Sequence, residues 1–274
     1  MMPHSRFSCL LLTLLVWLSP SLLAADVCSP DSPDNHSKPA QTDNSQATGL
    51  VAIDIAYALD GDSLKLVNGD ELRIIGINTP EKGEFLAGQA RQIMRQITAT
   101  TSKADKRFYI QPGRDNRDSY GRILAHLWIL QDDKWASPAI ELLEQGLAFH
   151  VAIHPNLAYI SCYSVAEQQA RTNKRGLWDS WQPVHSTSAK IKTGFTFISG
   201  EIVNIIDKGR FGSELVMAGD RVGLWIPAKS YQMFGGKGKV LKLRGQKVVA
   251  RGWVYKRNKN KRLQLAISHP NMLK

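Results

Sequence analysis

The sequence predicts a mainly β fold with helices (α+β), in which a β-barrel with packed helices is followed by a second small β-barrel. Short runs rich in β-branched residues, broken by Gly-Asp and Asn-Gly-Asp turns, indicate the strands. Segments with apolar residues at helical spacing indicate the packed helices. A stretch rich in Pro, Ser, Thr and Lys from Gln182 to Thr193 marks the boundary between the two barrels.

The first barrel is predicted from five strand-like runs, which fall at 51–59, 63–67, 71–77, 107–110 and 122–130. Apolar residues at helical spacing predict three helices, at 88–98, 138–146 and 164–174. Gly146 and Gly176 are expected to end the last two of these helices. This domain is therefore expected to span residues 50–181.

The second half contains five further runs of this kind, at 197–206, 214–218, 221–226, 247–255 and 262–267. A short helix is expected at 228–234, between the third and fourth runs, and a flexible stretch at 235–238. This order is the plan of an OB-fold barrel, although SH3-like small barrels give similar strand counts. The second domain is expected to span residues 195–274, behind a linker at 182–194.

Residues 1–25 have the form of a secretory signal peptide, with a weakly positive start and an almost unbroken apolar run from Cys9 to Leu18. An uncleaved N-terminal anchor is the alternative. The cleavage site stays open, because a leucine lies two residues before each of the alanines at 24 and 25. Residues 26–49 are polar and are expected to form a disordered linker. The mature protein is expected to be periplasmic or secreted, without membrane contact.

Two cysteines, Cys28 and Cys162, remain once the signal peptide is removed. In an exported protein such a pair can form a lasting disulfide, and two free thiols are the alternative.

The net charge of +11 comes from one end of the chain. Residues 26–189 carry 16 basic and 20 acidic side chains, whereas residues 190–274 carry 18 basic and four acidic ones. This asymmetry favours a polyanionic partner held by the C-terminal half, and a merely solubilising basic surface is the alternative.

Three clusters in the first half offer the groups needed to cleave a phosphodiester bond. They are Asp60-Gly61-Asp62-Ser63, then Asn78-Thr79-Pro80-Glu81 with Arg73 five residues before it, and Asp118-Ser119-Tyr120-Gly121-Arg122. Carboxylate and carbonyl oxygens suit a hard metal ion, a further carboxylate can act on water, and guanidinium groups can neutralise charge that develops on the phosphoryl group. Taken singly, the first two clusters predict no more than a tight turn and a proline-fixed loop.

In this combination and order the clusters resemble a staphylococcal nuclease (thermonuclease) domain, from about Leu50 to Trp178. Further markers of the resemblance are Glu144-Gln145-Gly146-Leu147-Ala148 and the stretch from Ala166-Glu167-Gln168-Gln169-Ala170 to Gly176-Leu177-Trp178. The resemblance implies an OB-type five-stranded β-barrel with helices. It also implies calcium-dependent hydrolysis of DNA and RNA that leaves 3′-phosphate ends.

The resemblance also implies a metal site. Asp62 matches the family's first metal-binding aspartate, and Thr79 matches the residue that offers a backbone carbonyl. Asn78 stands where the family often has a second metal-binding aspartate, so the site loses one negative charge. We therefore expect weaker Ca²⁺ binding or a preference for another divalent ion.

The catalytic groups implied by the resemblance are Glu81, Arg73 and Arg122. Glu81 matches the glutamate that activates or orients the attacking water. Arg73 and Arg122 match the two arginines that clamp the phosphate. Tyr120, next to Arg122 in its turn, is a candidate nucleic-acid contact.

One aromatic residue that the family places near the nucleotide, after Gly146-Leu147-Ala148, is missing here. His150 or His154 is a possible replacement. The favoured interpretation is that both are ordinary surface or loop histidines.

The second barrel is expected to bind nucleic acid through a basic hairpin loop, whose candidate contacts are Lys256, Arg257, Lys259, Lys261 and Arg262. Aromatic residues are interleaved with these charges, and OB barrels often stack bases on aromatics while a cationic groove follows the backbone. The alternative is that most of these aromatics are core residues, above all Trp253.

Together these features predict an exported, metal-dependent endonuclease acting on DNA and possibly RNA. The alternative is a non-catalytic nucleic-acid-binding protein that keeps a degenerate nuclease barrel as a scaffold. No protein partner is implied.

Overall fold

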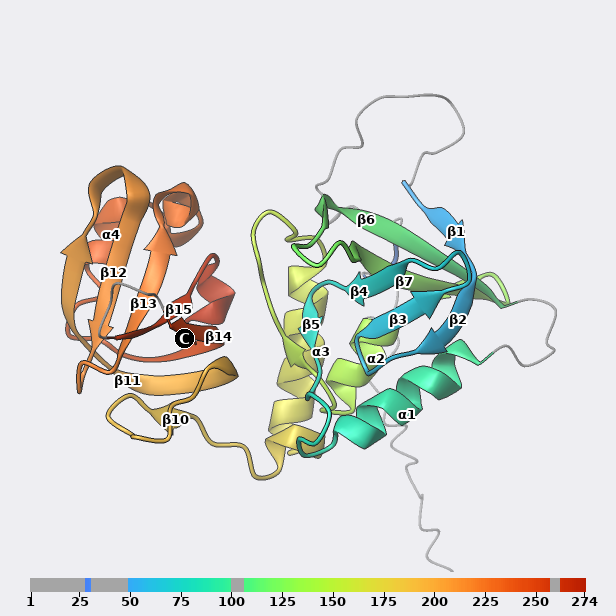
Figure 1. Ribbon diagram of the computed structural model, residues 1–274, viewed down its shortest axis with the longest axis horizontal. Helices are drawn as coiled ribbons and strands as arrows, with labels where there is room; N and C mark the ends of the chain where they lie inside the picture. Colours follow the sequence, from blue (N-terminus) through green and yellow to red (C-terminus); the bar gives the residue numbers. More distant parts are fainter. Residues whose placement is uncertain (1–27, 31–48, 100–105, 257–261) are drawn as a thin grey trace, which may run out of the picture.

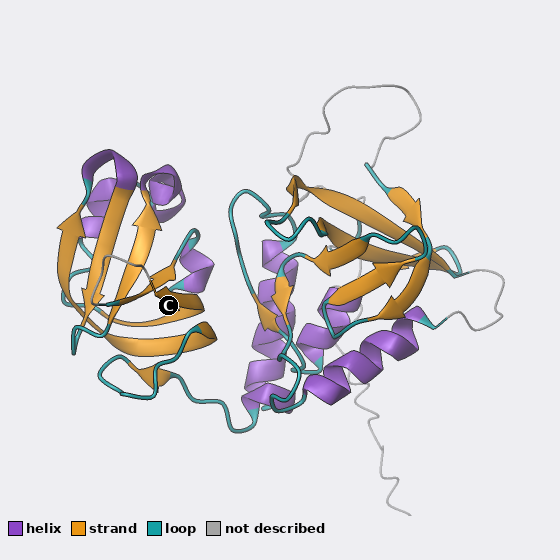
Figure 2. Cartoon of the chain, in the orientation of Figure 1, coloured by secondary structure: helices purple, strands orange, loops and turns teal. Residues whose placement is uncertain are grey.

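Two β-barrels make up most of the described chain, and helix α3 (Ile160–Thr172) lies between them (Figure 1). The computed structural model describes residues 28–30, 49–99, 106–256 and 262–274. Strands predominate in both halves, and the longer helices lie with the first barrel (Figure 2). The predicted mainly β fold with helices is confirmed. Among the described helices, none is both long and apolar enough to cross a membrane.

The first barrel is a curled sheet. Its strands are β1 (Val51–Ile53), β2 (Ile55–Ala58), β3 (Ser63–Leu66), β4 (Glu71–Ile74), β6 (Arg107–Arg117) and β7 (Ile123–Gln131), with the short β8 (Lys134–Ala136) added beside β7. They follow the order β1-β6-β7-β4-β3-β2, and only β4 and β7 are parallel. Only Asp54 separates β1 from β2, so one continuous stretch of chain joins the two edges of the sheet and closes the barrel.

Helices cover this barrel, namely α1 (Ala87–Thr98), α2 (Pro138–Glu144) and α3. α1 buries Ala90 and Met94 fully, because apolar residues four positions apart lie on one face of a helix. These residues join the same core as Leu64 and Leu72 of the neighbouring strands β3 and β4. The core thus fixes the strands that carry the first two sequence clusters.

The second barrel is closed as well. Its strands are β11 (Gly194–Asp207), β12 (Gly212–Met217), β13 (Val222–Pro227), β14 (Lys247–Lys256) and β15 (Leu263–Ala266). They follow the order β11-β12-β13-β15-β14, and β14 pairs again with β11. β13 and β15 are parallel, as β4 and β7 are in the first barrel. Both barrels therefore connect their strands in the same way, with helical segments between the third and fourth strands.

Several boundaries differ from the sequence prediction. The stretch at 235–238, predicted to be flexible, contains the start of a short helix, α4 (Lys237–Leu241). The linker contains a two-residue strand, β10 (Val184–His185), which pairs in parallel with β11. α3 begins four residues earlier than predicted. Trp253, predicted to be a core residue, is 37% exposed and contacts the Phe195 ring on the next strand.

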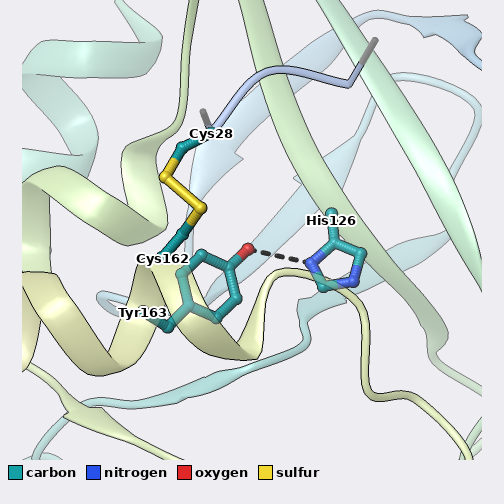
Figure 3. The surroundings of a disulfide bond; sticks show 4 residues. All are labelled: Cys28, His126, Cys162 and Tyr163. Carbon is teal, nitrogen blue, oxygen red and sulfur yellow. Dashed lines mark hydrogen bonds between the residues drawn. A yellow bond between two sulfur atoms is a disulfide. The ribbon is translucent and has the colours of Figure 1, made fainter. Parts of the chain in front are cut away.

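Cys28 and Cys162 form a disulfide, with their Cα atoms 5.8 Å apart. The bond ties the segment at 28–30 to α3, beside the hydrogen bond between the Tyr163 hydroxyl and His126 Nδ1 (Figure 3). Of the two alternatives that the sequence left open, the disulfide is therefore correct. The proposed signal peptide and most of the proposed linker at 26–49 lie outside the described residues.

Candidate active site

Asp62 is buried at the start of β3 and has two tightly held carboxylate oxygens. Oδ2 accepts the backbone N–H of Thr79 at 2.7 Å and lies 3.1 Å from Arg73 Nη2. Oδ1 accepts the hydroxyl of Ser63 at 3.1 Å. Burial raises the pKa of Asp62 to about 6, although the Arg73 guanidinium opposes this shift. The carboxylate thus lies where a cation at close range is strongly favoured.

Gly61 lets the first two clusters touch. A Cβ atom at this position would lie 2.6 Å from Thr79 Cγ2 and 2.9 Å from the Cβ of Ala90, so no side chain fits without a shift of the loop or of α1. Asp60 Oδ1 accepts the N–H of Asp62 at 2.9 Å and fixes the turn. The Asp-Gly-Asp turn therefore positions Asp62 against the second cluster.

Arg73, on β4, connects three parts of the site. Besides its contact with the buried carboxylate, its Nη2 donates to Asn78 Oδ1 at 3.1 Å and its Nη1 donates to the Ile77 carbonyl at 3.1 Å. Asn78 and Ile77 form the short strand β5 (Ile77–Asn78). Asn78 Nδ2 also lies 3.3 Å from the Thr79 carbonyl, to which it donates. The structure thus brings Asp62, Arg73, Asn78 and Thr79 together.

Glu81 lies on the exposed loop after β5. Its backbone N–H donates to Glu84 Oε2 at 2.8 Å, and its carbonyl accepts the N–H of Glu84 at 2.9 Å. These bonds form a local turn that leaves the Glu81 carboxylate exposed to solvent. An exposed carboxylate beside a phosphate site can reach a water molecule, which is the role predicted for Glu81.

Arg122 is held by Asp118 in the third cluster. Asp118 Oδ2 accepts Arg122 Nε at 2.7 Å, and Oδ1 accepts the backbone N–H groups of Arg122 and Tyr120. Burial acts against ionisation of Asp118, but these hydrogen bonds outweigh it and lower its pKa. Tyr120 is 84% exposed, and its ring centroid lies 5.5 Å from the Arg122 guanidinium carbon. The sequence marked Asp118 in the cluster but assigned it no role.

The two arginines lie close together along the neighbouring parallel strands β4 and β7. Arg73 pairs with Leu124 of β7, and Arg122 immediately precedes that strand. The side chains therefore start two residues apart along adjacent strands. Both arginines thus lie at the same edge of the β4–β7 pair.

The donor set for a metal consists of one carboxylate, from Asp62, and the neutral oxygens of Asn78 and the Thr79 carbonyl. Oxygen donors of this kind fit a hard cation such as Ca²⁺, which takes six to eight of them in proteins. Within the described residues no group of three or more His, Cys, Asp or Glu side chains could hold a metal ion. The three oxygens fit Ca²⁺ in kind, and water or substrate would have to complete the coordination.

Of the two histidines considered as nucleotide contacts, His154 lies in the loop between β9 and α3, as the favoured interpretation expected, whereas His150 does not. His150 is fully buried, so its prediction as a surface or contact residue is wrong. Its Nδ1 lies 3.2 Å from the Ser164 hydroxyl, and burial and nearby cations lower its pKa well below the usual value. His150 and Phe149 form β9 (Phe149–His150), a strand that pairs with β5 and that the sequence did not predict. A two-residue strand is too short to show the alternation of apolar and polar residues from which strands are predicted.

The basic hairpin of the second barrel is only partly described. Lys256 ends β14 and is exposed, whereas Arg257, Lys259 and Lys261 lie outside the described residues. Arg262 contacts the carboxylates of Glu214 and Asp220, with 2.9 Å from its Nη1 to Glu214 Oε1. Its charge is therefore already compensated within the barrel.

The chain resembles known proteins over its first barrel. Residues 71–180 match the family described as staphylococcal nuclease homologue. Endonuclease YncB of Bacillus subtilis (strain 168) is 30% identical over 141 residues, which is 47% of this chain and 62% of that protein. The SPbeta prophage-derived endonuclease YokF of the same organism is 30% identical over 141 residues, 47% of this chain and 44% of that protein. Thermonuclease of Staphylococcus intermedius is 26% identical over 130 residues, 46% of this chain and 74% of that protein.

The match to the family model includes Arg73, Asn78, Thr79, Glu81 and Arg122, and begins just after Asp62. The aligned part of this chain spans less than two thirds of the length of the two Bacillus subtilis relatives. The strand order, the arrangement of the site and this match agree with one another. Over residues 71–180 this chain is therefore similar to the staphylococcal nuclease family.

Proposed function

We propose that this protein is an exported, metal-dependent endonuclease that hydrolyses phosphodiester bonds of DNA and possibly RNA and leaves 3′-phosphate ends. The observation that carries the proposal is the contact of Arg73 with the buried Asp62 carboxylate, with Arg122 just before the neighbouring strand β7 and Glu81 on the loop after β5. The names of the relatives, two endonucleases and a thermonuclease, support the same reaction class.

Each residue has a distinct task in the proposed reaction. Glu81 accepts a proton from a water molecule, whose oxygen then attacks phosphorus in line with the departing 5′-oxygen. Arg73 and Arg122 donate hydrogen bonds to the phosphoryl oxygens as negative charge grows on them. Asp118 keeps the Arg122 guanidinium in one orientation, so little reorganisation is needed during the reaction.

Ca²⁺ is the first candidate for the metal, and the lost charge at Asn78 leaves another divalent ion as the second. Asp62, Asn78 and the Thr79 carbonyl would hold it. When bound, such an ion supplies positive charge that stabilises the phosphoryl oxygens and polarises a nearby water molecule. The burial of Asp62 supports a cation site, because a carboxylate removed from water is more easily ionised beside positive charge.

The second barrel, proposed as the domain at 195–274 after a linker at 182–194, would help to hold the polyanionic substrate. The excess of basic over acidic side chains in residues 190–274 supports this role. The proposed contacts are Tyr120 at the catalytic barrel and Lys256, Arg257, Lys259 and Lys261 at the hairpin. Arg262 is a weaker candidate than the sequence indicated, because two carboxylates already contact it.

Export to the periplasm or medium is part of the proposal. The signal-like composition of residues 1–25 supports it. The disulfide between Cys28 and Cys162 supports it as well, because disulfides persist in oxidising compartments.

The alternative function is nucleic-acid binding without cleavage. The observation that favours it is the Arg73 guanidinium, which contacts both Asp62 and Asn78 and so supplies positive charge where a metal would. In that case the first barrel would serve as a scaffold.

Substitutions at the site test the enzyme directly. We expect Arg122→Ala to lower kcat by about 10²- to 10³-fold, because one donor to the charged transition state is lost. We expect Glu81→Gln to lower it by at least about 10²-fold, because the amide cannot accept the proton. The assay is plasmid nicking by the full chain with Ca²⁺ present.

The matched controls are Lys134→Ala and Asp133→Asn, exposed residues at the turn between β7 and β8. Lys134→Ala removes a positive charge, as Arg122→Ala does, and Asp133→Asn removes a negative charge, as Glu81→Gln does. Both controls lie in the same barrel and should leave turnover unchanged. Near-normal turnover in Arg122→Ala or Glu81→Gln, with circular dichroism like that of the parent, would mean that the site is assigned to the wrong residues.

A further inference from the structure

Residues 149–154, here called the bridging segment, lie between the candidate site and the second barrel. On the side of the site, β9 pairs antiparallel with β5, so that Asn78 lies opposite Phe149 and Ile77 lies opposite His150. The N–H of Val151 then donates to the Gly76 carbonyl at 2.9 Å. The backbone that presents Asn78 is therefore one edge of a small sheet, and the bridging segment is the other edge.

Glu167 of α3 fixes the bridging segment from the opposite direction. Its Oε1 accepts the backbone N–H of His150 at 2.9 Å and contacts Arg251 Nη1 of β14. Glu167 is 1% exposed and Arg251 is 4% exposed. Arg251 also donates to the carbonyl of Asn271, at 3.1 Å from Nη2. A side chain of the second barrel thus neutralises the carboxylate that holds β9.

The ring of Phe149, opposite Asn78, also packs on the second barrel. Its centroid lies 5.0 Å from that of Phe197 and 5.6 Å from that of Phe195, both on β11, and 5.1 Å from that of Trp178. Aromatic pairs at these separations stabilise an interface beyond the area they bury. The residue paired with Asn78 is therefore held through its side chain as well.

The end of the bridging segment belongs to the core of the second barrel. Val151 and Ala152 are buried in the same apolar cluster as the inward-facing residues of that barrel. The Ala152 N–H lies 3.2 Å from Met272 Sδ, and the Ser268 hydroxyl lies 3.3 Å from the Ala152 carbonyl and 3.2 Å from the His154 N–H. The end of the bridging segment is therefore packed into the second barrel's own core.

We propose that the second barrel positions β5, the strand that carries Asn78. Arg251 is the positioning residue, and it acts on β5 through Glu167 and β9. Arg251 itself touches none of the candidate catalytic groups named above, so its effect is on geometry. The consequence for cleavage rests on the proposed nuclease function, whereas the effect on the backbone of β5 does not.

The physical reason is the cost of an unpaired buried charge. Without Arg251, the Glu167 carboxylate would remain buried without a hydrogen-bonded cation, since the Arg171 guanidinium is 4.0 Å away and Lys274 interacts with it only through its charge, and it would have to take a proton, admit water or move. Each of these responses weakens the acceptor of the His150 N–H and loosens β9. Displacements of about 1 Å in a catalytic group can cost about 10²-fold in rate.

The experiment compares full-length Arg251→Met with Lys237→Met as the matched control. Lys237 pairs with Asp207 on the exposed surface of the same barrel, so the control also removes one paired positive charge. Arg251→Lys is the second variant: it keeps the positive charge beside Glu167 but loses the guanidinium's contacts with both Glu167 and the Asn271 carbonyl, and it is the milder change if Arg251→Met does not fold. The first measurement is hydrogen–deuterium exchange in peptides that cover residues 74–80 and 149–152, without nucleic acid.

The proposal predicts that exchange in both peptides becomes at least about tenfold faster in Arg251→Met, less so in Arg251→Lys, and unchanged in Lys237→Met. It also predicts a kcat at least about tenfold lower at nearly constant KM, measured well below the melting temperature. Exchange like the parent's in the 74–80 peptide of both Arg251 variants would overturn the proposal, as would a lower melting temperature alone with unchanged kcat. If the parent protein does not cleave DNA but the exchange pattern appears, the positioning role stands and the proposed nuclease function fails.

Discussion

Arg73 is the residue on which the two proposed functions differ. Its guanidinium contacts Asp62 and Asn78 and supports the backbone of β5, so it organises the site even without substrate. With a second aspartate in place of Asn78, the same arginine would face two carboxylates. Because Asn78 is neutral, Arg73 faces one buried carboxylate, that of Asp62, and its single positive charge balances it. This arrangement explains how the site stays ordered despite the departure from the family pattern.

His126 gives the clearest pH dependence at the scale of one residue. It is buried against Tyr163, and burial lowers its pKa to about 3. In the unfolded chain a histidine takes up a proton near pH 6.5, which the folded state cannot do until about pH 3. The contribution of neutral His126 to the free energy of unfolding is therefore fully present above about pH 6.5 and is lost as the pH falls toward 3. From pH 8 to pH 5 this residue alone should cost about 2 kcal/mol in the free energy of unfolding.

Urea unfolding at pH 8 and pH 5 measures this effect. His126→Gln should reduce the loss between the two pH values by about 2 kcal/mol relative to the parent. Any change that the substitution makes to the stability at pH 8 cancels in this comparison. An equal pH dependence in parent and variant would show that His126 is already protonated in the folded protein or is not buried.

The disulfide is the feature that matters most at the scale of elements. It joins the segment at 28–30 to α3, and 134 positions separate the two cysteines along the sequence. A cross-link over so long a loop restricts the unfolded chain strongly and is worth about 2 to 5 kcal/mol. α3 also carries Glu167 and Tyr163, so the disulfide stabilises the element that connects the two barrels.

Removing the disulfide should therefore destabilise the protein without changing the site. We expect the double variant Cys28→Ser, Cys162→Ser to lose about 2 to 5 kcal/mol in the free energy of unfolding by urea. Cleavage at 25 °C should remain close to the parent's. The parent treated with a reductant should behave in the same way. Equal unfolding midpoints for parent and variant would mean that the bond does not constrain the unfolded chain.

The elements of the first barrel were predictable because their patterns are local. The alternation in β3 and β4 and the apolar spacing of α1 follow directly from the sequence. α3 was predicted to start too late, because it begins after Tyr159 in a left-handed conformation with no side-chain cap to mark it. α4 was missed because its Gly- and Lys-rich sequence has few apolar residues.

In the candidate site, too, some contacts were predicted from the sequence and others, between residues far apart in the chain, were not. The resemblance to the staphylococcal nuclease family implied that Asp62, Arg73, Asn78 and Thr79 would meet, and they do. The support of β5 could not be predicted, because Glu167 and Arg251 are 84 positions apart and the Ala166–Ala170 marker that contains Glu167 does not indicate Arg251 as its partner. A buried ion pair between domains leaves no periodic signal in a single sequence.

At the scale of the whole molecule, the barrels share strand order but differ in charge. The first half is mildly acidic and holds the candidate catalytic groups, whereas the second is strongly basic. The packing of the bridging segment into the core of the second barrel makes that barrel part of the fold that supports the site. Cutting the chain after Trp181 would uncover this segment, so point variants in the full chain are the better test of each barrel's role.

The central claim is that the full chain cleaves phosphodiester bonds with the help of a divalent ion. The most direct measurement incubates the mature protein with supercoiled plasmid in Ca²⁺ or in EDTA and then determines the chemistry of the new ends. The account predicts nicked and linear products in Ca²⁺, none in EDTA, and 3′-phosphate ends. Retention of the plasmid without cleavage in Ca²⁺, Mg²⁺ or Mn²⁺ would contradict it and favour a protein that only binds nucleic acid.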